Sequence, residues 1–324
     1  MARVVTFDEI GGPEVLKIVD LPIEEPGPAE VRLKVEAIGI NRLDQIVRSG
    51  NLFPPAFPRA RLGVEAAGVI DAIGHGVHDL AAGDEVIVTA VPNMDVNGTY
   101  ADYVNLAADA VIHRPGKLDA VHAAATWVAY STAYGALIEK AGMRPGDHVL
   151  ITAASSALGL AAIQIANQIG AVPIAMTRSV NKKADLLRAG AAAVVIADEG
   201  DAIESVRSLT GGAGADIVVD SVAGPGLPDL ARAAKSGGTV VVLGWLDTRP
   251  ALLPMNWPLT VIGYASFEHT TDPVVVKRIA AFLDAGLRTG ALKPTIAKVF
   301  DLEHIVDAHR YLECGEQLGK VVIA

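Results

Sequence analysis

The residues most suggestive of chemistry form a short run of small side chains between an apolar strand and an apolar helix. The segment reads "HVLITAASSALGLAAIQIANQI" and begins at His148. Such a tight turn brings backbone amides and a helix N-terminus toward a bound phosphate. The strict G-x-G-x-x-G pattern is absent, and a serine here can cap the helix or bind a phosphate, so the turn alone leaves both interpretations open. The candidate phosphate contacts are Ser155, Ser156, Ala157, Leu158 and Gly159, the last of which falls where helix and strand would pack most closely.

A basic residue downstream of this turn bears on which dinucleotide it would bind. In NAD-binding units a carboxylate about 20 positions further on accepts hydrogen bonds from the adenosine ribose. Here residues 171–183 contain no carboxylate, and Arg178 stands 19 positions after Gly159. Arg178, with Thr177 and Lys182, can hold a 2′-phosphate through charge-assisted hydrogen bonds, the alternative being a solvated basic helix start. The pattern therefore favours NADPH over NADH.

The elements that would hold these residues predict an α/β protein. Short runs of alternating apolar and polar residues bounded by glycine predict a compact, largely antiparallel β domain; they lie at 30–40, 65–74 and 83–90. After about residue 125, apolar strands alternate with helices, which predicts a parallel sheet covered on both faces. Pro173 removes a ladder donor and is expected among the first residues of the second strand.

The C-terminal segment returns to the pattern of the first domain. Residues 272–290 are predicted to be helical, and the tail "IAKVFDLEHIVDAHRYLE…GKVVIA" predicts a strand, a helix and a final strand. The domain of the dinucleotide-binding type is therefore expected to be an insertion over 125–265, between first-domain segments 1–124 and 266–324.

Composition and charge exclude several classes of protein. The 324 residues are 51% hydrophobic and 20% charged, with a formal net charge of −10, so nucleic acid and anionic membrane surfaces are not expected partners. The single cysteine, Cys314, excludes an intrachain disulfide. Asp8 and Glu9 interrupt any signal-peptide core, and the uncharged stretch 149–177 is interpreted as buried β-α-β structure. A soluble cytoplasmic protein is expected.

Taken together, the chain resembles the medium-chain dehydrogenase/reductase superfamily, and within it the zinc-free quinone oxidoreductase group that includes zeta-crystallin. The matching stretches run from "FDEIGGPEVLKI" and "VEAIGINRLDQIVRSG" through "LGVEAAGVIDAIGHGV", "GTYADY" and "RPGDHVLITAA" to "DIVVDSVAG", "GGTVVVLG" and "GKVV". Their order and spacing make the resemblance specific. It implies a GroES-like β-rich catalytic domain with an inserted Rossmann domain, and the cofactor in the cleft between them.

A catalytic metal is not expected. The zinc members of this superfamily offer Cys and His ligands at two places in the first domain, where this chain has Asn41 and Val64. No cysteine precedes Cys314. Hydride transfer to an already activated acceptor, such as a quinone or an α,β-unsaturated carbonyl, is then the expected chemistry.

Asn41 and Asp44, in "NRLD", resemble the N-x-x-D motif of the group. The resemblance implies that the Asn41 amide serves the nicotinamide or the acceptor oxygen, and that Asp44 orients the loop; capping of the next helix is the alternative for Asp44. The group often carries a tyrosine two residues after this aspartate. Here Ile46 stands there, which makes that pocket wall more apolar and leaves the substrate preference open.

Tyr130, in "WVAYSTAYGAL", matches a position near the nicotinamide in relatives. It is a candidate proton donor to an enolate or quinolate oxygen, and a packed tyrosine is the alternative. The segment 259–264 resembles the edge strand through which relatives form a homodimer. By resemblance, the remaining candidate cofactor contacts are Ser221, Gly244, Trp245, Leu246 and Phe267.

The expected function is NADPH-dependent reduction of a quinone or an enone. Two alternatives remain: reduction of an unsaturated thioester or pathway intermediate by the same hydride step, and a structural or regulatory NADPH-binding role, since the group includes abundant lens proteins.

Overall fold

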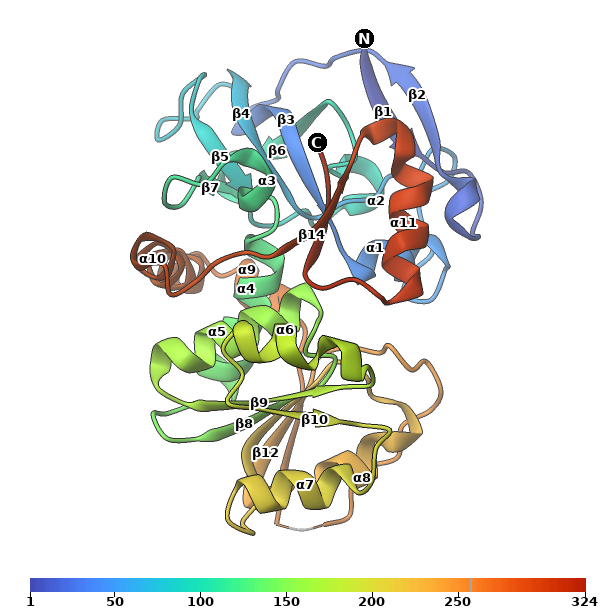
Figure 1. The fold of residues 1–324 in the computed structure, drawn as a ribbon. Helices are drawn as coiled ribbons and strands as arrows, with labels where there is room; N and C mark the ends of the chain where they lie inside the picture. The colour runs from blue at the N-terminus through green and yellow to red at the C-terminus, as the bar shows by residue number, and fades with distance from the viewer. Residues whose placement is uncertain (257) are drawn as a thin grey trace. The chain divides into compact units, whose positions relative to one another are not determined.

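The computed structural model describes residues 1–256 and 258–324, and the chain divides into two compact units (Figure 1). Unit 1 combines both ends of the chain, residues 1–128, 270–280 and 294–324. Unit 2 comprises residues 129–269 and 281–293. Unit 1 contains a largely antiparallel β-sheet and unit 2 a parallel one, so the α/β architecture expected from the sequence, a β-rich domain with an inserted parallel-sheet domain, is confirmed.

Unit 1 is organised around one long strand, β3 (Glu30–Ile40). It pairs antiparallel with β4 (Ala66–Ile73), β6 (Tyr103–Ala107) and the C-terminal β15 (Lys320–Ile323). The pairing of β15 with β3 explains why the tail resembles the first domain in sequence. The other strands of the unit are β1 (Ala2–Thr6), β2 (Lys17–Leu21), β5 (Glu85–Val88), β7 (Val111–His113) and β14 (Ile296–Phe300). The main sheet has the order β14-β15-β3-β4-β5-β7.

The burial pattern of β3 shows how this sheet is covered. Val31 and Leu33 are buried, whereas Arg32 between them is partly buried and Lys34 is exposed, as expected for a strand with one face on the core. From Ala37 to Ile40 every residue is buried, so both faces of that end are covered. That end of β3 leads directly into the loop that carries Asn41. The α-helices that lie wholly within the unit are α1 (Arg42–Arg48), α2 (Met94–Asn97), α3 (Ala120–Ala123) and α11 (Ile305–Cys314).

Unit 2 contains a parallel sheet with the order β10-β9-β8-β11-β12-β13. The chain builds outward from β8 through β9 to β10, then returns to the other side of β8 and continues through β11, β12 and β13. Ligands of open α/β sheets bind at the carboxyl ends of the strands, at the point where this direction reverses. The strand bounds are β8 (His148–Ile151), β9 (Val172–Thr177), β10 (Ala193–Ile196), β11 (Ala215–Asp220), β12 (Ala234–Val242) and β13 (Thr260–Gly263).

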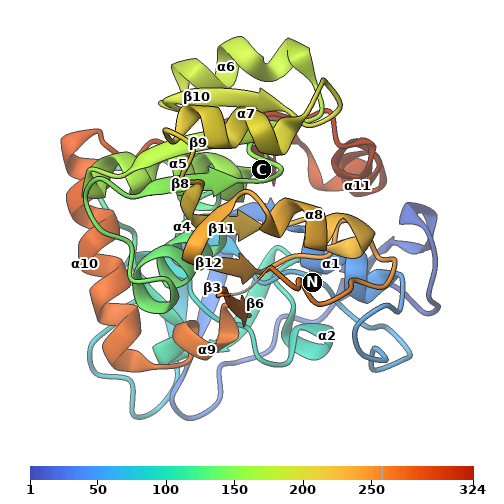
Figure 2. The same ribbon diagram turned by 90° about the horizontal axis from the view of Figure 1, so that it is seen from below.

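Helices connect and flank these strands (Figure 2). Pro173 is the second residue of β9, which confirms the expectation that it occupies the first residues of this strand. The other α-helices are α4 (Trp127–Tyr134), α5 (Ala157–Ile169), α6 (Lys183–Arg188), α7 (Ala202–Leu209), α8 (Leu227–Ala231), α9 (Phe267–Thr270) and α10 (Pro273–Thr289), and a π-helical segment (Gly135–Lys140) follows α4. The boundary between the units falls within α10, after Ala280.

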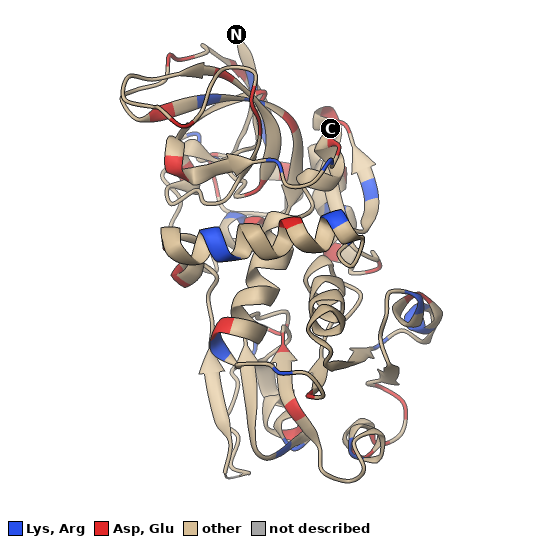
Figure 3. Ribbon diagram, turned by 90° about the vertical axis from the view of Figure 1, so that its left-hand side faces the viewer, with Lys and Arg blue, Asp and Glu red and all other residues tan. Residues whose placement is uncertain are grey.

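Charged residues of both signs are interspersed along the chain, as Figure 3 shows for the helices and strands of each unit. Within the described residues, every helix is too short or too polar to cross a bilayer.

The tight contact between α5 and the turn before it yields a stability prediction. A Cβ added at Gly159 would lie 2.5 Å from the Ala154 Cα and carbonyl oxygen, and backbone atoms cannot move aside cheaply. Gly159→Ala is therefore expected to lower the free energy of unfolding by about 1–3 kcal/mol in urea denaturation. The matched control is Gly226→Ala, since Gly226 has a φ of −77° and no atom within 4 Å of an added Cβ. Equal stability of the two variants would contradict this packing.

Candidate functional site

The turn between β8 and α5 is built without the usual glycines. Ala153 has a φ of +45°, in the left-handed region that favours glycine. A non-glycine residue held in this region marks a turn whose shape is imposed by its surroundings. Ala154 is fully buried under α5, so small side chains are required on both sides of the contact with Gly159.

The two serines of this turn have different partners. Ser156 caps α5: its hydroxyl oxygen accepts the Gly159 amide at 3.0 Å. Ser155 accepts a hydrogen bond from the Lys182 ammonium at 3.1 Å, which ties the turn to the start of α6. A hydroxyl that accepts these bonds keeps its own proton for donation. The amides of Ala157 and Leu158, in the first turn of α5, have no acceptor within the helix.

The carboxyl end of β9 carries the predicted 2′-phosphate residues. Thr177 is buried, and its hydroxyl accepts the amide of Ser179 at 3.2 Å. Arg178 is exposed at the next position. The structure therefore brings Lys182 together with the β8–α5 turn and leaves Arg178 open to solvent at the same edge of the sheet.

Asp220, at the end of β11, ties two neighbouring turns together. It is fully buried, and its carboxylate accepts the Thr152 hydroxyl at 2.8 Å and the Ala223 amide at 2.8 Å. Thr152 in turn accepts the Ser221 amide at 2.9 Å. The chain past the carboxylate again adopts a left-handed conformation, with a φ of +56° at Ala223. The turns after β8 and β11 thus share one buried anchor.

The end of β12 lies against the same region. A Cβ added at Gly244 would lie 2.6 Å from the Ser221 carbonyl oxygen, and the Leu246 amide donates to that oxygen at 3.2 Å. Trp245 is 54% exposed and Leu246 is 45% exposed, so these apolar side chains are open to solvent. Phe267, at the start of α9, is exposed as well.

Tyr130 is buried in unit 2 and its hydroxyl has an internal partner. It donates to the Gln164 side-chain oxygen at 2.8 Å, and the same oxygen accepts the Lys293 amide at 2.7 Å. Burial raises the pKa of the Tyr130 phenol. This arrangement matches the packing alternative, and the role of proton donor to substrate stays a prediction.

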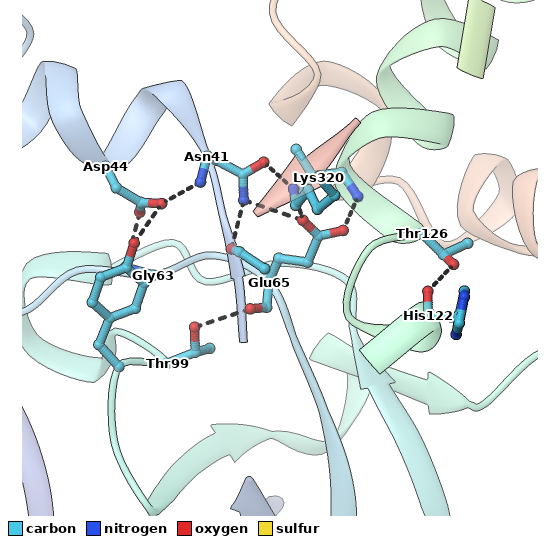
Figure 4. A network of polar contacts seen from close by, with 11 residues as sticks. Asn41, Asp44, Gly63, Glu65, Thr99, His122, Thr126 and Lys320 are labelled. Carbon is cyan, nitrogen blue, oxygen red and sulfur yellow. Dashed lines mark hydrogen bonds and ion pairs between the residues drawn. The ribbon is translucent and has the colours of Figure 1, made fainter. Parts of the chain in front are cut away.

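In unit 1, Asn41 meets a buried ion pair between Glu65 and Lys320 (Figure 4). The Asn41 side-chain nitrogen donates to the Gly39 carbonyl at 3.0 Å and to the Glu65 carboxylate at 3.1 Å. Its oxygen accepts the Lys320 ammonium at 2.6 Å. The other Glu65 oxygen accepts the Val128 amide at 2.8 Å. Glu65 is 1% exposed and Lys320 is 3% exposed, so the pair is desolvated.

Asp44 closes the loop that precedes α1. One carboxylate oxygen accepts hydrogen bonds from the backbone N–H of Asn41 at 2.7 Å and from the Tyr100 hydroxyl at 3.0 Å. The other oxygen accepts the backbone N–H of Gly63 at 3.0 Å. Burial raises the pKa of Asp44 to about 6, against the lowering effect of the Asn41 amide and the Tyr100 hydroxyl. The Asp44 carboxylate binds the backbone N–H of Asn41, the residue that precedes α1. This one contact both caps the helix and orients the loop, so the two roles considered for Asp44 coincide.

A directional chain of hydrogen bonds continues from Asp44 through Tyr100 to α11. The Tyr100 hydroxyl lies 3.1 Å from the His309 Nε2, and Arg48 lies 2.9 Å from the His309 Nδ1. Arginine only donates, so His309 Nδ1 is the acceptor and Nε2 carries the proton toward Tyr100. Burial, reinforced by the Arg48 charge, lowers the pKa of His309 to about 3, so the imidazole is neutral.

Sequence reasoning missed most of these supporting residues. Lys320 in "GKVVIA" and Asp220 in "IVVDSV" are charged residues next to apolar strand residues. A charge in such apolar surroundings was the sequence feature that could have identified them. His309 falls on the buried face of an amphipathic helix. Among the described residues, no group of three or more His, Cys, Asp or Glu side chains is placed to hold a metal ion.

Comparison with known proteins places both units in one superfamily. Residues 27–116 match the family model of the alcohol dehydrogenase GroES-like domain, and residues 157–279 match that of the zinc-binding dehydrogenases. The human quinone oxidoreductase is 32% identical over 329 residues, covering 100% of this chain and 98% of the human protein. The chain belongs to the quinone oxidoreductase family. As a member of this family it is an oxidoreductase.

Solved structures extend the likeness. The quinone oxidoreductase of Escherichia coli, solved in complex with NADPH, is 28% identical with a TM-score of 0.91, covering 100% of this chain and 99% of the other. The NADPH expectation is thus confirmed at the level of this family. A NAD-dependent alcohol dehydrogenase is 34% identical with a TM-score of 0.86 and 99% coverage of both chains. The CurK enoyl reductase is 25% identical with a TM-score of 0.89, covering 100% of this chain and 99% of the other.

The neutral imidazole gives a pH-dependent prediction. Unfolded His309 takes up a proton below about pH 6.5, whereas the folded imidazole resists protonation down to about pH 3. Its contribution to stability is therefore present near pH 7 and is lost as the pH falls. In His309→Gln this loss disappears, so the stability advantage of wild type over the variant is expected to shrink by several kcal/mol from pH 7 to pH 4 in urea denaturation.

Asp44 acts in the opposite sense, because its raised pKa lets the folded state keep a proton that the unfolded state has lost. Its contribution falls as the pH rises from about 4 to 6, but it is common to both proteins and cancels in the difference. A difference between wild type and His309→Gln that does not change with pH would contradict a neutral, buried His309.

Proposed function

We propose that this quinone oxidoreductase family member is an NADPH-dependent, zinc-independent reductase that transfers a hydride to a quinone or an α,β-unsaturated carbonyl. The observation that carries the proposal is the small-residue turn after β8 combined with an arginine, in place of a carboxylate, after β9. The E. coli quinone oxidoreductase solved with NADPH supports the choice of cofactor. The enoyl reductase CurK supports the inclusion of conjugated carbonyls.

The β8–α5 turn fits a pyrophosphate. In this proposal the open amides of Ala157 and Leu158 and the hydroxyl protons of Ser155 and Ser156 point to the phosphate oxygens, and the dipole of α5 favours the negative charge. The Lys182 ammonium on Ser155 adds a positive charge next to the same turn. The missing glycines do not open the turn, because Ala153 holds the required left-handed conformation.

Arg178 is the proposed reader of the 2′-phosphate. Its guanidinium is exposed at the carboxyl end of β9 and can form two parallel bonds to a phosphate. Thr177 is buried with its hydroxyl committed to the Ser179 amide, so we assign it to shaping the turn. The absence of a side chain at Gly244 lets the β12 end approach Ser221 closely, and the nicotinamide half of the cofactor is proposed to lie along these two strand ends.

When bound, NADPH supplies the hydride that, with one proton, reduces a quinone to a hydroquinone or an enone to a saturated carbonyl. Asn41 and Asp44 are proposed to form the loop next to the reacting groups, with Asp44 acting only on the loop because it is fully buried. Zinc independence is proposed from the residue types: Asn41 and a buried Val64 occupy the positions where zinc members carry soft ligands. Trp245 is proposed as an apolar wall for the acceptor.

A homodimer is part of the proposal. β13 ends the strand order of the unit 2 sheet, and Val261 on it is exposed. Pairing of β13 with a second copy would cover an edge that otherwise invites non-specific association. The apolar residues Leu252, Leu253 and Met255, which precede β13 in the chain, are exposed too. A cytoplasmic location stays a prediction.

Arg178→Ala is expected to weaken NADPH binding about tenfold or more while leaving NADH binding within about twofold, because only NADPH offers a 2′-phosphate for a charge-assisted bond. Dissociation constants would be measured by isothermal titration calorimetry. The matched control is Arg188→Ala, another exposed arginine of unit 2, which pairs with Asp185 on α6. Equal weakening of both cofactors would show that Arg178 does not read the 2′-phosphate.

The reaction itself is tested by following NADPH oxidation at ~340 nm with a panel of quinones and a panel of enones, before and after dialysis against a chelator. Turnover that survives chelation is expected with members of at least one panel. Tight NADPH binding without turnover on either panel would favour the structural or regulatory alternative. Turnover confined to unsaturated thioesters would favour the pathway reductase.

A further inference from the structure

The hydrogen bonds around Asn41 determine which way its amide faces. Lys320 carries only donors, so it must meet the amide oxygen. The Gly39 carbonyl and the Glu65 carboxylate only accept, so both must meet the amide nitrogen. The reversed amide would set oxygen against two acceptors and nitrogen against an ammonium, three repulsive contacts in place of three favourable ones.

The cluster that holds this amide has little room to rearrange. A Cβ added at Gly39 would lie 2.1 Å from the Ala124 carbonyl oxygen, 2.7 Å from a Glu65 oxygen and 2.8 Å from the Lys320 Cε. Glu65 is also held from its other side, by the Val128 amide at 2.8 Å. Both charges of the pair are buried, and losing either partner would leave the other unpaired in a desolvated site.

A count of hydrogen-bonding capacity shows what Asn41 can still do. The amide nitrogen has two protons, and both are used. The amide oxygen has two lone pairs, and Lys320 uses one. Asn41 is partly exposed, unlike the ion pair beneath it. Its one remaining capacity is therefore a single acceptor position on the oxygen.

We propose that Asn41 acts as a hydrogen-bond acceptor for a donor group on the bound ligand, an amide N–H or a hydroxyl, and that Glu65 and Lys320 are positioning residues that hold it in this state. The inference rests on the proposed function, since it presumes that the Asn41 loop meets cofactor or substrate. Of the two roles expected from the sequence, a bond to the nicotinamide carboxamide is compatible with this state. A hydrogen bond donated by Asn41 to the oxygen of a quinone or enone substrate is not compatible with it, because both protons of the side-chain amide are already used.

Two ligand pairs distinguish the source of the donor. The first is NADPH and its 3-acetylpyridine analogue, in which a methyl group replaces the carboxamide nitrogen. The second is 1,4-naphthoquinone and its hydroquinone, titrated anaerobically onto the NADP⁺ complex, where only the hydroquinone offers donors. Dissociation constants are measured for wild type and for Asn41→Ala, with Asn105→Ala as the control. Asn105 also lies in unit 1, and its amide bonds the Glu24 and Glu25 carbonyls.

The expected result is a preference for the donor-bearing member of one pair that is about five- to tenfold greater in wild type than in Asn41→Ala, the size of one lost hydrogen bond. Asn105→Ala should match wild type. If Asn41→Ala loses the preference within the first pair, the hydrogen-bond donor belongs to the cofactor. If it loses the preference within the second pair, the donor belongs to the reduced substrate. No change in either pair overturns the inference, as does a greater preference in the variant. Absence of NADPH binding to wild type would instead overturn the proposed function.

The positioning role has its own test in the double variant Glu65→Gln/Lys320→Met, which removes both buried charges together and frees the amide to reverse. We expect the preference in the responsive pair to fall toward that of Asn41→Ala while circular dichroism reports an intact fold. A folded double variant with the full wild-type preference would show that the ion pair does not position Asn41. If the double variant does not fold, Glu65→Gln and Glu65→Leu are scored by the same ratio. We expect the glutamine variant, which keeps an acceptor for Asn41, to retain more of the wild-type preference than the leucine variant, and equal preferences would contradict the positioning role.

Discussion

Buried carboxylates must be saturated with donors, and this requirement shapes the loops of the candidate site in each unit. Asp44 and Asp220 are fully buried and Glu65 is 1% exposed. An ionised carboxylate without partners would be too costly in such places. Asp44 and Asp220 gather backbone amides and a hydroxyl group, and Glu65 adds the Lys320 ammonium. The same contacts that satisfy these groups fix the backbone on either side of them.

The buried carboxylates fix the positions of the candidate ligand-binding groups through their hydrogen bonds. Asp220 joins the turns after β8 and β11, so that Ser221 and the Ser155 turn are held on one frame. Asp44 accepts a hydrogen bond from the backbone N–H of Asn41, and Glu65 accepts one from its side-chain amide nitrogen. Rigid supports of this kind preorganise a binding site, because the ligand does not have to order the loops. We therefore expect a bound cofactor to meet backbone amides and hydroxyl groups that are already fixed in place.

The fold was accessible from the sequence because it rests on local periodicity. Alternating strands and helices predicted the parallel sheet, and the strand in "GKVVIA" was correctly given to the first domain. Gly159 was correctly placed at a close contact, since its neighbours in the sequence are also its neighbours in space. The Ser156 cap was one of two open alternatives, and the structure contains it.

The supports of the site could not be derived in the same way, because they join residues far apart in the chain. Glu65 and Lys320 are 255 positions apart, and Arg48 and His309 are 261 apart. The local sequence indicates that each of these four polar residues is unusual for its surroundings, but it does not identify the residue that each one contacts. Tyr130 illustrates the same limit: Gln164, which binds its hydroxyl, lies one helix further along the chain. Without that partner, the packing and catalytic interpretations were equally open.

A crystal structure of the protein with NADPH would show directly whether these preorganised groups receive the cofactor. We expect the pyrophosphate on the turn of Ser155–Leu158, the 2′-phosphate within hydrogen-bond distance of Arg178, and the bonds of Asp44, Glu65 and Asp220 unchanged within each unit. A cofactor whose phosphates avoid this turn, or an Asn41 amide reversed away from Lys320, would contradict it.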